Sequence, residues 1–279
     1  MISIKNISYT YMKGTPFEKT ALENISFNVA AGEVLAIAGH TGSGKSTLIQ
    51  IIAGLIDLMG GSVTIDNLPV NDKKIRRLVG IVFQYPEHQL FEETVESDIA
   101  FGPKNFGLSD AEISARVEEA MRQVGLNAAL KKVSPFELSG GQRRRVAIAG
   151  ILALKPKYLI LDEPTAGLDP LAKENLLKEI FGEIKKSGVT IILVSHNMED
   201  IARFANRVVV LAQGKILFVG SPRELFAQEK ILARAGLEPP PITQLLRTLN
   251  ISEQALTLDE AEKIILTKKI NSPVKKRNC

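Results

Sequence analysis

The fold is decided by residues 34–46, which read VLAIAGHTGSGKS. The apolar start, residues 34–38, predicts a short buried strand, and residues 46–53 have the apolar spacing of a helix. Between them lies a match to the phosphate-loop pattern G-x-x-x-x-G-K-[ST]. Glycines let backbone N–H groups approach phosphate oxygens, and a helix N-terminus adds positive potential. Strand, glycine-rich loop and helix in this order therefore predict a nucleotide phosphate site.

Two side chains of this loop have specific expected roles. Lys45 is placed to contact the β- and γ-phosphates of ATP, and the hydroxyl of Ser46 to ligate Mg²⁺. His40 occupies a variable position of the pattern, so we expect it to line the site without a catalytic role. The predicted nucleotide-binding residues of the loop are Gly39, His40, Thr41, Gly42, Ser43, Gly44, Lys45, Ser46 and Thr47.

A second apolar run, residues 158–161, ends in two acids, Asp162 and Glu163. A carboxylate at the end of a buried strand can reach Mg²⁺, which is the role expected for Asp162. Glu163 would then act as the general base that polarises the attacking water. Such a pair alone is often a solvated strand end. The phosphate loop before it favours the catalytic interpretation.

The remaining pattern indicates an α/β fold with a largely parallel sheet, because strands alternate with helices. Strands are predicted at residues 2–11, 21–29, 80–83, 158–161 and 190–194, with a hairpin over 208–219. Helices are predicted at residues 46–53, 109–125, from near 141, and at 171–186. Residues 238–241 read EPPP and are expected to break structure.

Composition narrows the class of protein. The 279 residues carry a net charge of +4, with 5% aromatic residues and no Trp, which argues against a nucleic-acid partner. Apolar runs are far shorter than the ~20 residues of a membrane span, and the N-terminus lacks signal-peptide features. The single cysteine, Cys279, permits no intramolecular disulfide. We therefore expect a cytosolic chain.

Residues 138–142, LSGGQ, resemble the signature sequence of the ATP-binding-cassette (ABC) ATPases. This resemblance implies a P-loop NTPase of the ABC type, with an antiparallel β subdomain and an α-helical subdomain. It also implies that the signature of one subunit closes over the ATP held by the phosphate loop of another. The residues implied in that contact are Ser139, Gly140, Gly141 and Gln142.

The same resemblance assigns roles to four further residues. Tyr11 matches the aromatic residue that stacks on adenine, and Gln84 the glutamine that senses Mg²⁺ and the attacking water. Asp169 matches the loop that communicates between subunits, and His196 the switch histidine at the γ-phosphate. The implied catalytic residues are Lys45, Gln84, Glu163 and His196, and the implied metal-site residues are Ser46, Gln84 and Asp162. A plainer alternative for Tyr11 is packing within its strand.

Residues 83–103, FQYPEHQLFEETVESDIAFGP, closely resemble the ATPases of energy-coupling factor (ECF) transporters. That resemblance implies a dimer with a second, sister ATPase, docked on a transmembrane coupling protein at the cytoplasmic face of the membrane. A substrate-binding membrane protein joins the complex, and the cargo is a vitamin or a transition-metal ion. Residues 85–91 would line the docking groove, or alternatively only pack within the helical insertion.

The domain boundaries follow from the same reasoning. Residues 1–235 are predicted to form the ABC ATPase domain, with a helical insertion at roughly 88–155, and residues 236–279 a mostly helical extension with a basic tail. Three other functions remain open: another ABC importer ATPase, a soluble ABC ATPase acting on DNA or ribosomes, and a P-loop kinase or GTPase. The signature argues against the last of these.

Overall fold

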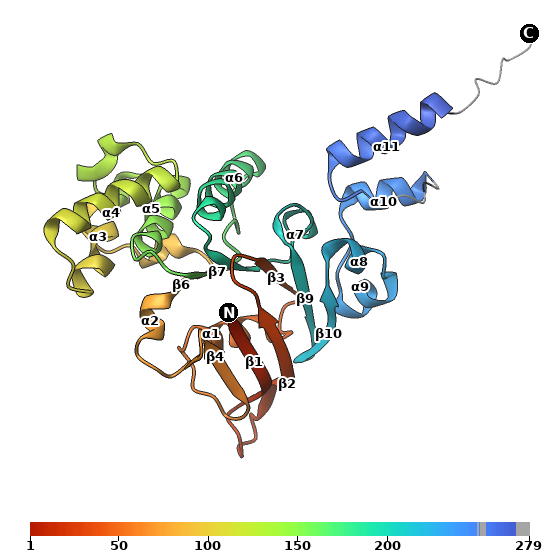
Figure 1. The fold of residues 1–279 in the computed structure, drawn as a ribbon, viewed down its shortest axis with the longest axis horizontal. Helices are drawn as coiled ribbons and strands as arrows, with labels where there is room; N and C mark the ends of the chain where they lie inside the picture. The colour runs from red at the N-terminus through yellow and green to blue at the C-terminus, as the bar shows by residue number, and fades with distance from the viewer. Residues whose placement is uncertain (250, 252–254, 272–279) are drawn as a thin grey trace, which may run out of the picture.

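The computed structural model describes residues 1–249, 251 and 255–271, without the side chains of Lys185 and residues 268–271. The described strands form two sheets, one six-stranded with the order β10-β9-β3-β8-β7-β6 and one four-stranded with the order β2-β1-β4-β5. Figure 1 shows the four-stranded sheet below the six-stranded one, with the helices α3, α4 and α5 to one side. The predicted ABC-type α/β architecture with an antiparallel β part and a helical part is confirmed.

The larger sheet is parallel except at one edge. Its parallel strands are β3 (Val34–Ala38), β6 (Val79–Val82), β7 (Tyr158–Asp162), β8 (Thr190–Val194) and β9 (Arg207–Ala212), and β10 (Lys215–Gly220) pairs antiparallel with β9. All five residues of β3 and of β8 are buried, as expected for strands covered on both faces. Parallel pairing places the carboxyl ends of these strands at one edge.

The smaller sheet is antiparallel and covers the phosphate-loop helix. It consists of β1 (Ile2–Tyr11), β2 (Lys19–Val29), β4 (Ser62–Ile65) and β5 (Leu68–Pro69). Ile2, Ile4 and Ile7 of β1 share a buried cluster with Leu48 and Ile52 of α1 (Lys45–Ile52). The apolar side chains of β1 and β2 thus bury α1 against both sheets.

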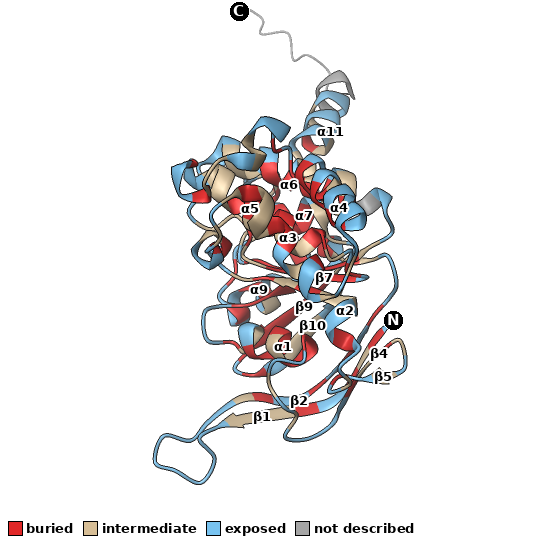
Figure 2. Ribbon diagram, turned by 90° about the vertical axis from the view of Figure 1, so that its left-hand side faces the viewer, coloured by how far each residue is buried: buried red, intermediate tan, exposed pale blue. Residues whose placement is uncertain are grey.

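The helical part lies between β6 and β7 in the chain. Its α-helices are α3 (Val95–Asn105), α4 (Asp110–Gln123) and α5 (Gly140–Leu152), and its 3-10 turns are η1 (Pro86–Gln89), η2 (Ala128–Lys132) and η3 (Pro135–Glu137). Capping boxes start α4 at Ser109 and α5 at Ser139, which explains why both helices begin where the sequence predicted. In Figure 2 the buried residues concentrate where α3, α5 and α6 (Pro170–Lys186) meet the sheet.

The remaining helices complete the sheet cover and the C-terminal part. They are α2 (Ile75–Leu78), α7 (Met198–Phe204), α8 (Pro222–Phe226), α9 (Glu229–Ala235), α10 (Pro241–Thr248) and α11 (Leu258–Asn271). Residues 238–240 interrupt the helices between α9 and α10, as predicted, and Pro241 occupies the first position of α10, where its missing N–H costs nothing. The helices α10 and α11 share a small cluster of their own around Leu246 and Ala261.

Two sequence predictions concern the end of the chain. The basic tail, including residues 275–277, and Cys279 lie outside the described residues, as do the side chains of Lys268 and Lys269.

Over the described part of the chain, every helix is too short or too polar to cross a bilayer.

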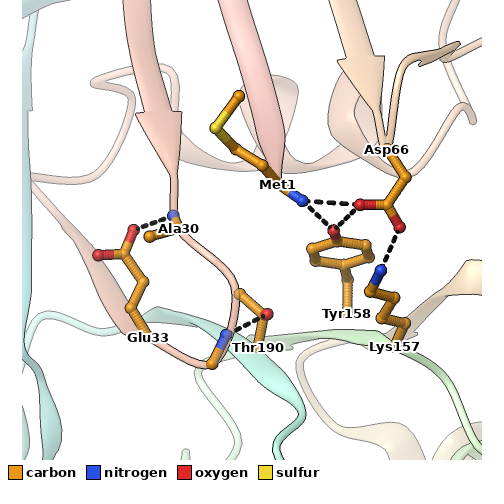
Figure 3. Close-up of polar contacts among 8 residues, drawn as sticks. Met1, Ala30, Glu33, Asp66, Lys157, Tyr158 and Thr190 are labelled. Carbon is orange, nitrogen blue, oxygen red and sulfur yellow. Dashed lines mark hydrogen bonds and ion pairs between the residues drawn. The ribbon is translucent and has the colours of Figure 1, made fainter.

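Asp66 joins the two sheets at the edge where the parallel strands begin (Figure 3). Its carboxylate accepts hydrogen bonds from the α-amino group of Met1 (2.7 Å), the Tyr158 hydroxyl (2.6 Å) and Lys157 Nζ (2.6 Å). Desolvation opposes its ionisation, but these hydrogen bonds outweigh that effect and hold the pKa of Asp66 well below its ordinary value. Asp66 and Asn67 have φ of 49° and 67°, which suits the tight β4–β5 turn.

We predict that Asp66→Asn destabilises the protein at pH 7 by about 1–2 kcal/mol, because charged hydrogen bonds at a partly exposed site are lost. Asn tolerates the positive φ, so the change isolates the charge. Because the pKa of Asp66 is lower in the folded than in the unfolded protein, its ionised carboxylate stabilises the fold above the unfolded pKa of about 3.9. This stabilisation is lost as the pH falls through the folded-state pKa. The stability difference measured by urea unfolding should therefore stay constant from pH 7 to about 4 and shrink below that. A difference independent of pH down to 3 would contradict this role.

Candidate functional site

The phosphate loop has a backbone that only glycine accommodates at its key points. Gly39 and Gly44 have φ of 149° and 106°, and a Cβ added at Gly44 would lie 2.5 Å from the Ala21 carbonyl oxygen. Among the described residues no side chain caps α1 at Gly44, so its first-turn N–H groups face the loop. This arrangement fits a bound phosphate, which such N–H groups and the helix dipole attract.

The loop is held from behind by the β9–β10 turn. Gly214 N–H donates to the Ser43 carbonyl (3.1 Å), and the Gly214 carbonyl accepts from Glu23 N–H (2.8 Å). The Ser43 hydroxyl is fully buried and has no hydrogen-bond partner within the described part of the chain. The loop conformation therefore depends on contacts with both sheets.

Lys45 lies folded along the loop. Its Nζ donates to the carbonyl oxygens of Gly39 (2.7 Å) and His40 (3.0 Å). Burial lowers the pKa of Lys45, while Glu163 and Asp162 oppose that shift. An ammonium group in this position has the charge and the reach that phosphate oxygens require.

Tyr11 lies beside the start of α1. Its hydroxyl is 3.1 Å from Thr47 Oγ1, and its ring packs edge-to-face on Tyr9 with centroids 4.9 Å apart. Its ring is thus anchored next to the phosphate loop and remains partly exposed. Stacking of Tyr11 on adenine stays a prediction.

The two acids end β7 next to this loop. Asp162 pairs in register with Val194, and Glu163 N–H donates to the Val194 carbonyl (3.0 Å). Burial raises the pKa of Asp162 to about 6, with a further increase from Glu163 and an opposing effect of Lys45. Because ionising Asp162 is costly in this environment, a cation bound beside it would stabilise its ionised carboxylate.

Glu163 and His196 are in direct contact. Glu163 Oε1 accepts from His196 N–H (2.9 Å) and lies 2.7 Å from His196 Nδ1. Glu163 has φ of 47°, a conformation that a non-glycine residue adopts only when its surroundings enforce it. The structure thus brings together the predicted general base and the predicted switch histidine.

Glu163 and His196 line a pocket of about 570 Å³. It is lined by Gly39, His40, Thr41 and Lys45 together with Glu163 and His196. Residues 236–241 and Gln244, after α9, form another part of its wall. Sequence reasoning assigned no role to this segment, and a proline-rich run carries no signal for such a contact.

Several sequence-predicted residues do not line this pocket. Residues 139–142, Gln84 and Asp169 are absent from its described lining, and so are Tyr11, Asp162 and residues 42–44, 46 and 47. Ser139 Oγ accepts from Gln142 N–H (3.3 Å) at the start of α5, and Asp169 Oδ1 accepts from Ala172 N–H (2.9 Å) at the start of α6. Gln84 is exposed after β6. A single chain therefore assembles the phosphate side of the site without its signature.

We predict that Asp162→Asn stabilises the nucleotide-free, metal-free protein by roughly 1–3 kcal/mol at pH 7–8. A carboxyl group whose pKa is raised in the folded state destabilises the folded protein, increasingly so as the pH rises from the unfolded-state to the folded-state pKa of that group. The gain should therefore be negligible below about pH 4, grow towards pH 6 and level off above it. Urea unfolding between pH 4 and 8 measures it, with the exposed Asp57→Asn as control. A loss of stability at pH 7–8 would contradict the assigned environment.

Comparison with known proteins agrees with this geometry. The family model for the ABC transporter matches residues 22–166. The energy-coupling factor transporter ATP-binding protein EcfA2 of Clostridium acetobutylicum is 51% identical, over 95% of this chain and 96% of its own length. EcfA2 of Caldanaerobacter subterraneus subsp. tengcongensis is 52% identical over the same shares, 95% and 96%.

Solved structures give the same result. The structure of cbiO1 from Clostridium perfringens, part of the ABC transporter complex cbiONQ, has a TM-score of 0.75 and 38% identity over 88% of this chain and 98% of that one. The ATP-binding cassette MJ0796, solved as a dimer in a post-hydrolysis state with ADP and Pi, has a TM-score of 0.71 and 33% identity over 80% and 99%. The chain belongs to the ATP-hydrolysing ABC transporter family and, within it, to the energy-coupling factor transporter ATP-binding proteins.

Proposed function

We propose that this chain is one of two ATPase subunits that energise an energy-coupling factor importer. The observation that carries the proposal is the separation of the two phosphate-binding surfaces in one chain. Lys45, Glu163 and His196 share a pocket, whereas the signature at residues 139–142 starts α5 outside it. A second subunit must therefore supply the signature to complete each site.

The hydrolytic roles follow from the contacts in the pocket. Lys45 would bind the β- and γ-phosphates, and Glu163 would take the proton of the attacking water. His196, hydrogen-bonded to Glu163 Oε1, would orient that carboxylate and contact the γ-phosphate. Ser46, Asp162 and Gln84 are the residues that would hold Mg²⁺. When bound, Mg²⁺ neutralises negative charge on the phosphate oxygens.

The signature of the partner would cover the γ-phosphate. In this chain Gly140 and Gly141 are open, because a Cβ added at either meets no described heavy atom within 4 Å. Their N–H groups lie in the first turn of α5, which is a favourable position for an anion. ATP would thus close the dimer, and loss of the γ-phosphate would weaken it.

The membrane partner would dock on exposed aromatic side chains in and after the segment that follows Gln84. Phe91 is 58% exposed and Phe101 42% exposed, and their rings pack edge-to-face with centroids 4.8 Å apart. Tyr85, also exposed, stacks on His88 at 5.8 Å. This docking surface, defined by Tyr85, Phe91 and Phe101, suits a short amphipathic helix of a transmembrane coupling protein. The chain would then lie peripherally at the cytoplasmic face of the membrane.

Cargo selection would reside in a third protein. A substrate-binding membrane protein would capture a vitamin or a transition-metal ion and join the coupling protein. The described residues hold no cluster of metal-ligating side chains large enough for a cargo ion.

We predict that Glu163→Gln lowers kcat for ATP hydrolysis by ~10²–10⁴, because the general base is lost. ATP binding should be retained, since Lys45 and the loop are unchanged. Phosphate release and binding of a fluorescent ATP analogue measure the two effects, with Glu118→Gln on the exposed face of α4 as the matched control. Turnover near that of the wild type would refute the role of Glu163.

We predict that tagged protein extracted from native membranes co-purifies with a second ABC ATPase, a transmembrane coupling protein and small hydrophobic binding proteins. The double change Phe91→Ser and Phe101→Ser should remove the membrane proteins while the second ATPase remains. Phe17→Ser, at a 77% exposed aromatic in the β1–β2 turn, is the control that should keep them. Mass spectrometry that finds only ribosomal or DNA-repair proteins would refute the transport function and leave the ATPase chemistry intact.

A further inference from the structure

Arg144 is a charged residue in the interior of the protein. It lies in α5, just after the signature, and is 2% exposed. By volume, Arg144 is the largest of the fully buried side chains among the described residues. Because an unpaired buried charge is very costly, its partners must compensate it fully.

The guanidinium of Arg144 binds two different segments. Nε and Nη2 donate to the two carboxylate oxygens of Glu87 at 2.9 and 2.6 Å, a bidentate ion pair. Nη1 donates to the carbonyl oxygens of Ala166 (2.7 Å) and Pro164 (3.4 Å). Arg144 also lies 5.8 Å from the ring centroid of Tyr85.

These contacts join three functional elements of the chain. Glu87 lies three residues after Gln84, and Arg144 itself is attached to the signature helix. Pro164 follows Glu163 directly, and Ala166 N–H donates to the Glu163 carbonyl (3.0 Å), which closes a turn. Glu163 opens that turn with its strained φ of 47°, so the carbonyls held by Arg144 help to enforce the conformation of Glu163.

Only arginine has the geometry for this junction. Its planar fork presents several donors in fixed directions, whereas a lysine ammonium is a compact point charge that cannot span a carboxylate and two carbonyls. Arg145, the next residue of α5, offers a direct contrast. It donates to Glu179 of α6 and to the carbonyl of Val124 at the end of α4, and among the described residues it makes no hydrogen bond to either loop.

We propose that Arg144 is a positioning residue for ATP hydrolysis, which sets the orientation of Glu163 through the turn at residues 163–166 and that of Gln84 through Glu87. Movement of the signature helix, of the segment after Gln84, or of the turn after Glu163 must then displace the other two. A corollary rests on the proposed function: docking at Tyr85 would reach Glu163 through this one side chain.

The test compares Arg144→Lys with Arg145→Lys in the full-length chain, assembled with the second ATPase subunit that it co-purifies with. The readouts are kcat and KM for ATP, binding of an ATP analogue and thermal unfolding. Arg144→Lys keeps the charge that neutralises Glu87 but not the fork. We expect kcat to fall roughly tenfold or more, because small misplacements of catalytic groups are costly. The KM for ATP of Arg144→Lys should stay within about twofold of the wild-type value, and its unfolding temperature should fall no further than that of Arg145→Lys. The kcat of Arg145→Lys should stay within about twofold of the wild-type value.

Glu87→Gln provides a second test that leaves Arg144 in place. It should also lower kcat with little change in KM, and adding it to Arg144→Lys should lower kcat no further, because both changes disrupt one junction. A kcat of Arg144→Lys within twofold of the wild type would overturn the proposal and leave Arg144 as a neutraliser of Glu87. A fully additive double variant would overturn it as well. The wild-type turnover is the reference, so failure of the transport assignment would not affect this test.

Discussion

Parallel pairing of β3, β7 and β8 brings the chemical groups of this protein to one edge of a sheet. Val194 pairs with both Ile37 and Asp162, so the phosphate loop after β3, the acids at the end of β7 and His196 after β8 lie at the same level. Glu163 N–H continues the ladder by donating to the Val194 carbonyl. The geometry of the site is therefore an extension of strand pairing, and the close packing of the fully buried strands β3 and β8 keeps it rigid.

The helical part contributes to the site differently. Its signature starts α5 and does not line the phosphate pocket of the same chain, and the exposed rings of Phe91 and Phe101 belong to the same helical part. The two parts of the chain meet at the Arg144 junction, where a buried ion pair and two carbonyl contacts connect α5 to the catalytic turn. An ATPase that couples ATP hydrolysis to a conformational change needs such a connection, because coupling between two sites requires groups that move together.

Much of the fold and of the phosphate site could be predicted because it depends on local patterns. The strand, loop and helix at residues 34–53, the acids after β7 and the capping box at Ser139 are each specified by consecutive residues. The Asp66 network, the buried Arg144 and the pocket wall at residues 236–241 are different, since they join segments far apart in the chain. In a sequence, Arg144 is one of three consecutive arginines, and nothing in that run distinguishes the buried one.

Cysteine cross-linking determines whether the signature of one subunit completes the phosphate pocket of the other. The chain would carry Cys279→Ser and Ser139→Cys, and the second ATPase would carry glutamine in place of its own general base, so that ATP in the pocket closed by Ser139→Cys is held rather than hydrolysed. The co-purifying second ATPase would carry one cysteine in its own phosphate loop. We expect an intermolecular disulfide that forms rapidly with Mg-ATP and slowly without it. A cross-link that forms equally well without nucleotide, or none at all while ATP is bound, would contradict it.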